Sequence, residues 1–177
     1  GVNYLVNTTV YPRAGSLTTQ IREGALPEER ADFDTIAEES TPPNLVRNIA
    51  YTVKIAKSQI SYEGSAVINL SVSHAWAETT DNIYVIGYGT DRYGNRAGSL
   101  IPAKYRFTAG GLDYFEAEIP EGADYFSTFA LSDLDGSGNP FQLITLSVIN
   151  AGGNDGGGGA GTGRDREEAA DKKRVNQ

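Results

Sequence analysis

The chain has 177 residues, a mass of 18.9 kDa and a formal net charge of −8. This length suits one domain with a sizeable core. The charge lies in residues 1–150, which hold 18 acidic and 10 basic side chains. Because phosphates are neutralised by clustered Lys and Arg, we expect no nucleic-acid partner. Cysteine is absent, which excludes disulfides, thiolate metal sites and a thiol nucleophile.

The ends of the chain and its hydropathy bear on location. No run of 18 apolar residues occurs, so we expect no membrane span. The first residue is Gly1, and methionine is absent. The simplest expectation is an N-terminus left by removal of a secretory signal, although an engineered or trimmed chain would look the same. That expectation places the protein outside the cell.

The N-terminal part predicts two short elements and a third segment with two interpretations. Residues 3–11 alternate and are rich in Val, Thr and Tyr, which predicts a strand ended by Pro12, and residues 16–21 offer a second strand. Residues 27–39 begin with Pro and acidic side chains, the order favoured in the first turn of a helix. Their apolar stripe is short, so a brief helix and an acidic surface loop fit equally well.

Strand patterns then follow one another at spacings of eight to twelve residues, which is typical of a sandwich or barrel. In residues 112–119, Phe115, Ala117 and Ile119 alternate with polar side chains, which predicts a half-buried strand. We predict an all-β protein with an antiparallel β-sandwich of the Ig-like or Greek-key type, with one short helix near 27–39 as an option. The other expected strands are residues 48–56, 66–73, 82–89 (the candidate sheet centre), 100–108, 125–131 and 141–150.

The composition changes after residue 150. A glycine-rich stretch is followed by charged residues without an apolar stripe, which predicts a flexible, charged tail over 151–177. Residues 45–150 are expected to form the sandwich core. Residues 1–44, with the N-terminal strands and the acidic segment, are expected to belong to the same domain.

Several motifs together resemble a known family. Residues 114–120 (YFEAEIP) and 126–132 (FSTFALS) are similar to the closing strands of the PGF-pre-PGF domain of methanogenic archaea, and residues 46–49, residues 67–72 and Trp76 match its earlier motifs. The resemblance covers about residues 45 to 132. It implies a secreted surface protein, and hence a structural, self-assembling subunit of a sheath, S-layer or surface filament in an archaeal cell envelope.

One loop has the spacing of a calcium site. Asp133, Asp135 and Ser137, followed by Gly138, reproduce positions one, three, five and six of an EF-hand-type loop. Position twelve is Ile144 instead of Glu. We predict a candidate calcium site formed by Asp133, Asp135, Ser137 and Asn139, with an ordinary hairpin turn as the alternative.

The sequence offers little for catalysis. His74 is the only histidine, and no Gly-x-Ser-x-Gly motif accompanies it. Glu116 and Glu118 are two apart on the solvent face of a strand, where alternating acids are ordinary. We expect no enzyme.

Two further sets of residues are candidates for contacts outside the chain. The sequons place candidate glycosylation sites at Asn7 and Asn69. The N-terminal strand is set apart from the core by Pro12 and Gly15, so it could add to an edge of a neighbouring subunit or close its own sheet. The candidate self-association residues are Asn3, Leu5, Asn7, Thr9 and Tyr11.

The alternative function is an extracellular module that binds carbohydrate or another protein. Exposed aromatic side chains are the usual means of such recognition. Tyr88, Tyr93 and Tyr105 are the candidates for that surface.

Overall fold

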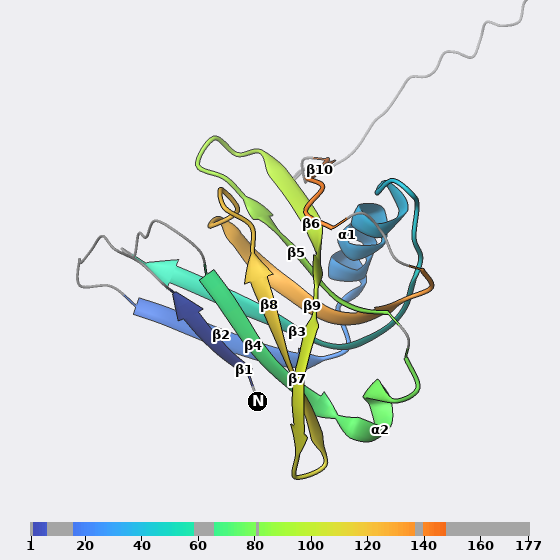
Figure 1. Cartoon of the computed structure of the whole chain (residues 1–177). Coiled ribbons are helices and arrows are strands. Elements are labelled where there is room, and N and C mark those ends of the chain that lie inside the picture. Colours follow the sequence, from blue (N-terminus) through green and yellow to red (C-terminus); the bar gives the residue numbers. More distant parts are fainter. Residues whose placement is uncertain (1, 7–15, 59–65, 81, 137–139, 148–177) are drawn as a thin grey trace, which may run out of the picture. The chain divides into compact units, whose positions relative to one another are not determined.

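Two antiparallel β-sheets and two short helices make up the structure, a computed structural model (Figure 1). It describes residues 2–6, 16–58, 66–80, 82–136 and 140–147. All of the described helices and strands belong to one compact unit, Gly1–Leu146. The predicted tail over 151–177 lies outside the described residues.

The smaller sheet has four strands in the order β1-β4-β8-β7, and every neighbouring pair is antiparallel. Its inner strands are joined over eight residue pairs, from Ala66 opposite Ile119 to Ser73 opposite Leu112. The strands are β1 (Val2–Val6), β4 (Ala66–Ser73), β7 (Lys104–Ala109) and β8 (Leu112–Ile119).

The larger sheet has six strands in the order β10-β6-β5-β9-β3-β2, again antiparallel throughout. Its central strands are β5 and β9, so the most apolar run of the sequence does lie at the sheet centre, as predicted. The strands are β2 (Ser16–Glu23), β3 (Val46–Ser58), β5 (Ile83–Thr90), β6 (Arg96–Pro102), β9 (Phe126–Leu134) and β10 (Ile144–Leu146).

The two sheets pack face to face around a shared core, which confirms the predicted antiparallel β-sandwich. On β8, alternate side chains are buried and the intervening ones are half-buried or exposed, as the sequence pattern required. Burial of this apolar surface is the main force that holds the layers together. The core side chains are Ile68, Leu70, Ala117 and Ile119 from the smaller sheet and Val53, Ile55, Val85, Ile101, Phe126, Phe129 and Leu131 from the larger one.

The outer face of the larger sheet is covered by a helix, α1 (Pro27–Glu38). Pro27 occupies the first turn, where no N–H is needed, and Glu29 Oε1 accepts a hydrogen bond from Leu26 N at 2.9 Å. Phe33 and Ile36 are fully buried against β5, β6 and β9. Of the two interpretations of this segment, the helix is therefore the one observed, and it adds a third layer to the molecule (Figure 1).

One detail of the predicted strands was wrong. Residues 100–108 are not one strand, because the chain leaves the larger sheet after Pro102 and enters the smaller one at Lys104. Proline has no N–H with which to continue a ladder, and Ala103 N instead donates to Ile83 O. In β3, a register shift between Ile49 and Tyr51 turns Ile49 to the helix side, while Tyr51 stays in the sandwich core.

A second helix follows directly after β4, which ends at residue 73 as expected. Ser73 ends β4, and its Oγ accepts a hydrogen bond from Trp76 N at 3.1 Å, starting α2 (His74–Ala77). Trp76 is half-buried on this single turn. Among the described residues, no helix is long and apolar enough to cross a membrane.

Candidate functional site at the open edge of the smaller sheet

Strand β7 forms an edge of the smaller sheet. In the described part of the chain it pairs only with β8, and all six of its residues, Lys104–Ala109, are exposed. An unpaired edge presents a row of backbone N–H and C=O groups to any extended chain that approaches. Strand β1 forms the opposite edge of the same sheet.

Aromatic side chains stand on both faces of this edge. Phe107 is 53% exposed and stacks on Tyr114, with ring centroids 4.6 Å apart, whereas Tyr105 meets the ring of buried Phe115 edge-on at 5.9 Å. Tyr105 and Phe107 are two positions apart and would share a face in a regular strand. A register shift between them turns their side chains to opposite faces of β7. The edge therefore offers apolar surface on each side of its open backbone.

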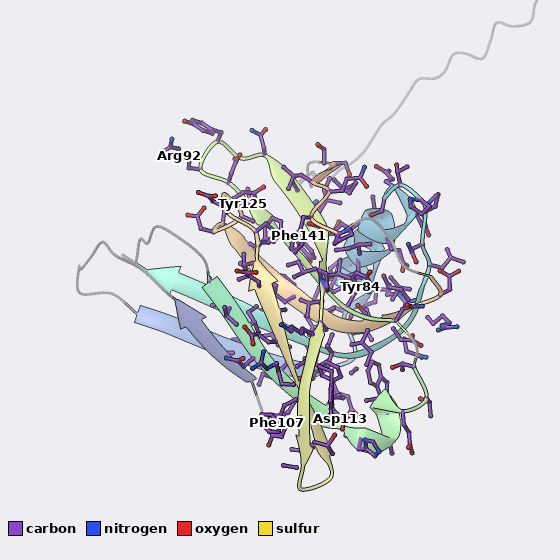
Figure 2. All side chains as sticks on the ribbon, in the orientation of Figure 1. Tyr84, Arg92, Phe107, Asp113, Tyr125 and Phe141 are labelled. Atoms are coloured by element: carbon purple, nitrogen blue, oxygen red, sulfur yellow. The ribbon has the colours of Figure 1, made fainter. Side chains whose placement is uncertain are left out.

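A chain of hydrogen bonds ties the base of this edge to α2 (Figure 2 marks Phe107 and Asp113). Asp113 Oδ1 lies 2.9 Å from His74 Nδ1 and accepts the hydroxyl of Thr108 at 2.7 Å. Because the Thr108 proton is committed to Asp113, the Tyr105 hydroxyl is the donor in its 2.8 Å bond with Thr108 Oγ1. The Asp113 carboxylate of β8 thus joins β7, through Thr108, to α2, through His74.

The two charged members of this network stabilise each other. The hydrogen bond and the negative charge of Asp113 raise the pKa of His74 above its ordinary value of 6.5. The Thr108 hydroxyl, and then His74, lower the pKa of Asp113 below its ordinary value of 3.8. The imidazolium and the carboxylate are therefore both favoured in mildly acidic solution.

This coupling predicts a pH-dependent contribution to stability. A raised histidine pKa gives a contribution that is complete below about pH 6.5 and is lost as the pH rises through the raised value. A lowered aspartate pKa gives a contribution that is present above about pH 3.8 and is lost in more acidic solution. The melting temperature of the protein should therefore exceed that of His74→Gln most clearly near pH 5 to 6.

The sole histidine makes the measurement direct. Its Cε1 proton resonance should titrate above pH 6.5 in the intact protein and return towards the ordinary value in Asp113→Asn. A midpoint at or below 6.5 in the intact protein would contradict the coupling. Sequence reasoning missed this pair, although an acid at Asp113, on the core-facing side of β8, was a visible signal.

Two of the predicted self-association residues lie on the other edge of this sheet. Asn3 and Leu5 belong to β1, which pairs with β4 of its own chain through Asn3–Asn69 and Leu5–Val67. Within its own chain β1 is therefore an edge strand, and its part in self-association stays a prediction. Asn7, Thr9 and Tyr11 lie outside the described residues.

The two acids of the predicted calcium loop have different surroundings. Asp133 is buried at the end of β9, and its Oδ1 lies 3.1 Å from Arg47 Nη2. Asp135 is exposed, and its Oδ1 accepts a hydrogen bond from Leu45 N at 2.8 Å. Ser137 and Asn139 lie outside the described residues.

The remaining predicted positions are dispersed. Asn69 is half-buried within β4, between β1 and β8, while Asn7 lies outside the described residues. The three tyrosines proposed for ligand binding do not form one surface. Tyr88 is 9% exposed beneath α1, Tyr93 lies in the β5–β6 turn, and Tyr105 lies in the other sheet. Burial raises the pKa of Tyr88 to about 12, consistent with a core residue.

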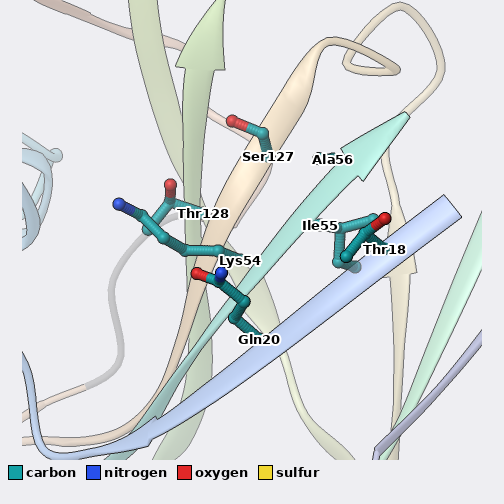
Figure 3. A pocket seen from close by; sticks show the side chains of 7 residues that line it. All are labelled: Thr18, Gln20, Lys54, Ile55, Ala56, Ser127 and Thr128. Carbon is teal, nitrogen blue, oxygen red and sulfur yellow. The ribbon is translucent and has the colours of Figure 1, made fainter. Parts of the chain in front are cut away.

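A shallow depression of about 290 Å³ lies on the larger sheet (Figure 3). Among the described residues that line it, Lys54 is the charged one, and its Nζ lies 3.3 Å from the buried Glu29 carboxylate. The charge of Lys54 is thus already paired within the fold and is not free to bind a ligand in the depression. The lining residues are Thr18, Gln20, Lys54, Ile55, Ala56, Ser127 and Thr128.

The chain matches no protein-family model, no curated protein and no solved structure. The family resemblance carried by its motifs therefore stays a prediction. The strongest functional feature within the described residues is the pair of open edges on one sheet.

Proposed function

We propose that this protein is a structural, self-assembling subunit of an extracellular cell envelope, as in a sheath, S-layer or surface filament, and that it is not an enzyme. The observation that carries the proposal is that β1 and β7 occupy the two edges of one small sheet and that both edges are unpaired within the described residues. The resemblance to surface proteins of methanogenic archaea supports the location.

The direction of the strands makes these edges compatible. Each of the three pairings in the order β1-β4-β8-β7 is antiparallel, so β1 and β7 run in opposite directions. A second copy placed beside the first in the same orientation would bring its β1 against β7 in an antiparallel sense. Because the contact joins two different edges, it is heterologous and repeats from copy to copy, which yields a ring or an open filament rather than a two-fold dimer.

The aromatic side chains of β7 support the same contact. Backbone hydrogen bonds supply direction in strand addition, while side chains on each face supply specificity. Phe107 and Tyr105, on opposite faces of the edge, would each lose exposed apolar surface to a neighbouring strand.

The test is the mass and shape of the purified protein. Light scattering should give a mass that grows with concentration, and electron microscopy should show regular filaments or sheets with one repeat per subunit. A monomer at every concentration up to the millimolar range, with no regular polymer, would overturn the proposal.

A binding module is the second candidate, favoured by one observation. The stacked rings of Phe107 and Tyr114 form an apolar surface on the solvent-facing side of the edge, a feature that suits the face of a sugar ring. Titration with oligosaccharides, followed by tyrosine chemical shifts, tests it. Saturable shifts in a protein that stays monomeric would favour this candidate over assembly.

A further inference from the structure

Two connecting segments meet beside the end of α1. The α1–β3 connection is held to the chain after β9 by Asp135 N to Leu45 O at 3.0 Å and by Leu45 N to Asp135 Oδ1 at 2.8 Å. A third hydrogen bond runs from Thr41 N to Gln142 Oε1 at 2.9 Å. These bonds fix the backbone on both sides of Asn44.

Asn44 has an oxygen without a partner at this junction. Asn44 is 2% exposed, and its Oδ1 is buried and accepts no hydrogen bond. Its Nδ2 instead points to Pro42 O at 3.4 Å, so turning the amide over would bring two acceptors together. A Cβ built on Gly136 would lie 3.2 Å from Asn44 Oδ1, which places this oxygen against the turn that follows Asp135.

The acid that directly precedes that turn, Asp135, is exposed and has one carboxylate oxygen bound to Leu45 N. Arg47 pairs with Asp133, and no ion pair to Asp135 occurs within the described part of the chain. Burying an amide oxygen without a partner costs free energy, and a neighbouring carboxylate disfavours another acceptor there. A small cation satisfies both groups, because carbonyl and carboxylate oxygens are the ligands that hard cations prefer.

We propose that Asn44 Oδ1 and the Asp135 carboxylate bind a calcium ion, with water completing its coordination shell. Calcium accepts irregular sets of oxygen ligands, whereas magnesium requires near-ideal octahedral geometry. Asp133 is not a ligand, because its carboxylate is engaged by Arg47. The site is independent of the assembly proposed above. It revises the ligand set predicted from the loop spacing by adding an oxygen that lies 91 residues before Asp135 in the chain.

Calcium titration of chelator-treated protein tests the site. We expect a dissociation constant of about 10⁻⁴ to 10⁻³ M, the range of extracellular modules, and a melting temperature raised by about 3 to 11 °C in 10 mM calcium. Sodium chloride of equal ionic strength is the control for general screening. Asp135→Asn should abolish the calcium response, and Asp133→Asn should lower the melting temperature while keeping it.

Asn44→Asp separates a ligand from a merely structural amide. Without calcium it should lower the melting temperature, since it places a second carboxylate near Asp135. The Asn44→Asp variant should bind calcium more tightly than the natural protein, and added calcium should restore its melting temperature. A merely structural amide would give no such recovery. The proposal is overturned if calcium gives no calorimetric heat at 10 mM, if Asp135→Asn keeps the response, or if Asp133→Asn loses it.

Discussion

Gly98→Val is expected to lower the free energy of unfolding by about 3 kcal/mol, because this glycine lies where α1 approaches the larger sheet. A Cβ at Gly98 would stand 2.4 Å from Ile36 Cδ1 and 2.6 Å from Gly87 O. The first contact is with the end of a side chain, which can turn aside, whereas the second is with the backbone of β5, which cannot yield cheaply. The expected result is a molecule whose α1 no longer seats on the sheet.

Urea denaturation followed by circular dichroism measures this loss, and a double-mutant cycle identifies its cause. Ile36→Val removes the Cδ1 atom and by itself should cost about 1 kcal/mol. In that background, Gly98→Ala should cost less than it does in the natural protein, while the contact with Gly87 O remains. Equal costs in the two backgrounds would mean that Ile36 does not press on Gly98.

Alternation of apolar and polar residues along the chain predicted the strands that have one face on the core and the other in solvent. On β8, Phe115, Ala117 and Ile119 had to share a face, and they do, because one face of that strand meets the core and the other meets solvent. The turn at Gly110 and Gly111 was equally predictable, since both residues adopt positive φ, at 60° and 78°. These features depend only on neighbours in sequence.

Features that depend on distant residues were not accessible in this way. Strands β6 and β7 belong to different sheets because of contacts with residues far away in sequence. Ala103 N, between the two strands, donates to Ile83 O of β5, and Tyr105 of β7 lies opposite Phe115 of β8. The candidate site followed the same rule: His74 meets Asp113 across 39 residues. The sequence around Asn44 gave no signal, because its unpaired oxygen lies against a turn that begins 91 residues later, after Asp135.

Phe107→Lys is expected to convert the assembled protein into folded monomers. A charged side chain on an edge strand blocks pairing, because adding another strand would bury the ammonium group without a partner. The substitution also removes the stacked contact with Tyr114, which should cost the monomer no more than about 1 kcal/mol. Loss of assembly should therefore far exceed loss of fold, as light scattering and thermal melting together will show.

Tyr93→Lys is the matched control, since it makes the same change of charge at another exposed aromatic residue. Tyr93 is 74% exposed in the β5–β6 turn, where it extends no sheet edge, and Arg92 lies 5.0 Å from the centre of its ring. If general repulsion between subunits dispersed the polymer, both variants would become monomeric. If pairing at β7 holds the subunits together, Tyr93→Lys should assemble normally and Phe107→Lys should not. Assembly of both variants would place the contact elsewhere and leave β7 as an edge without a partner.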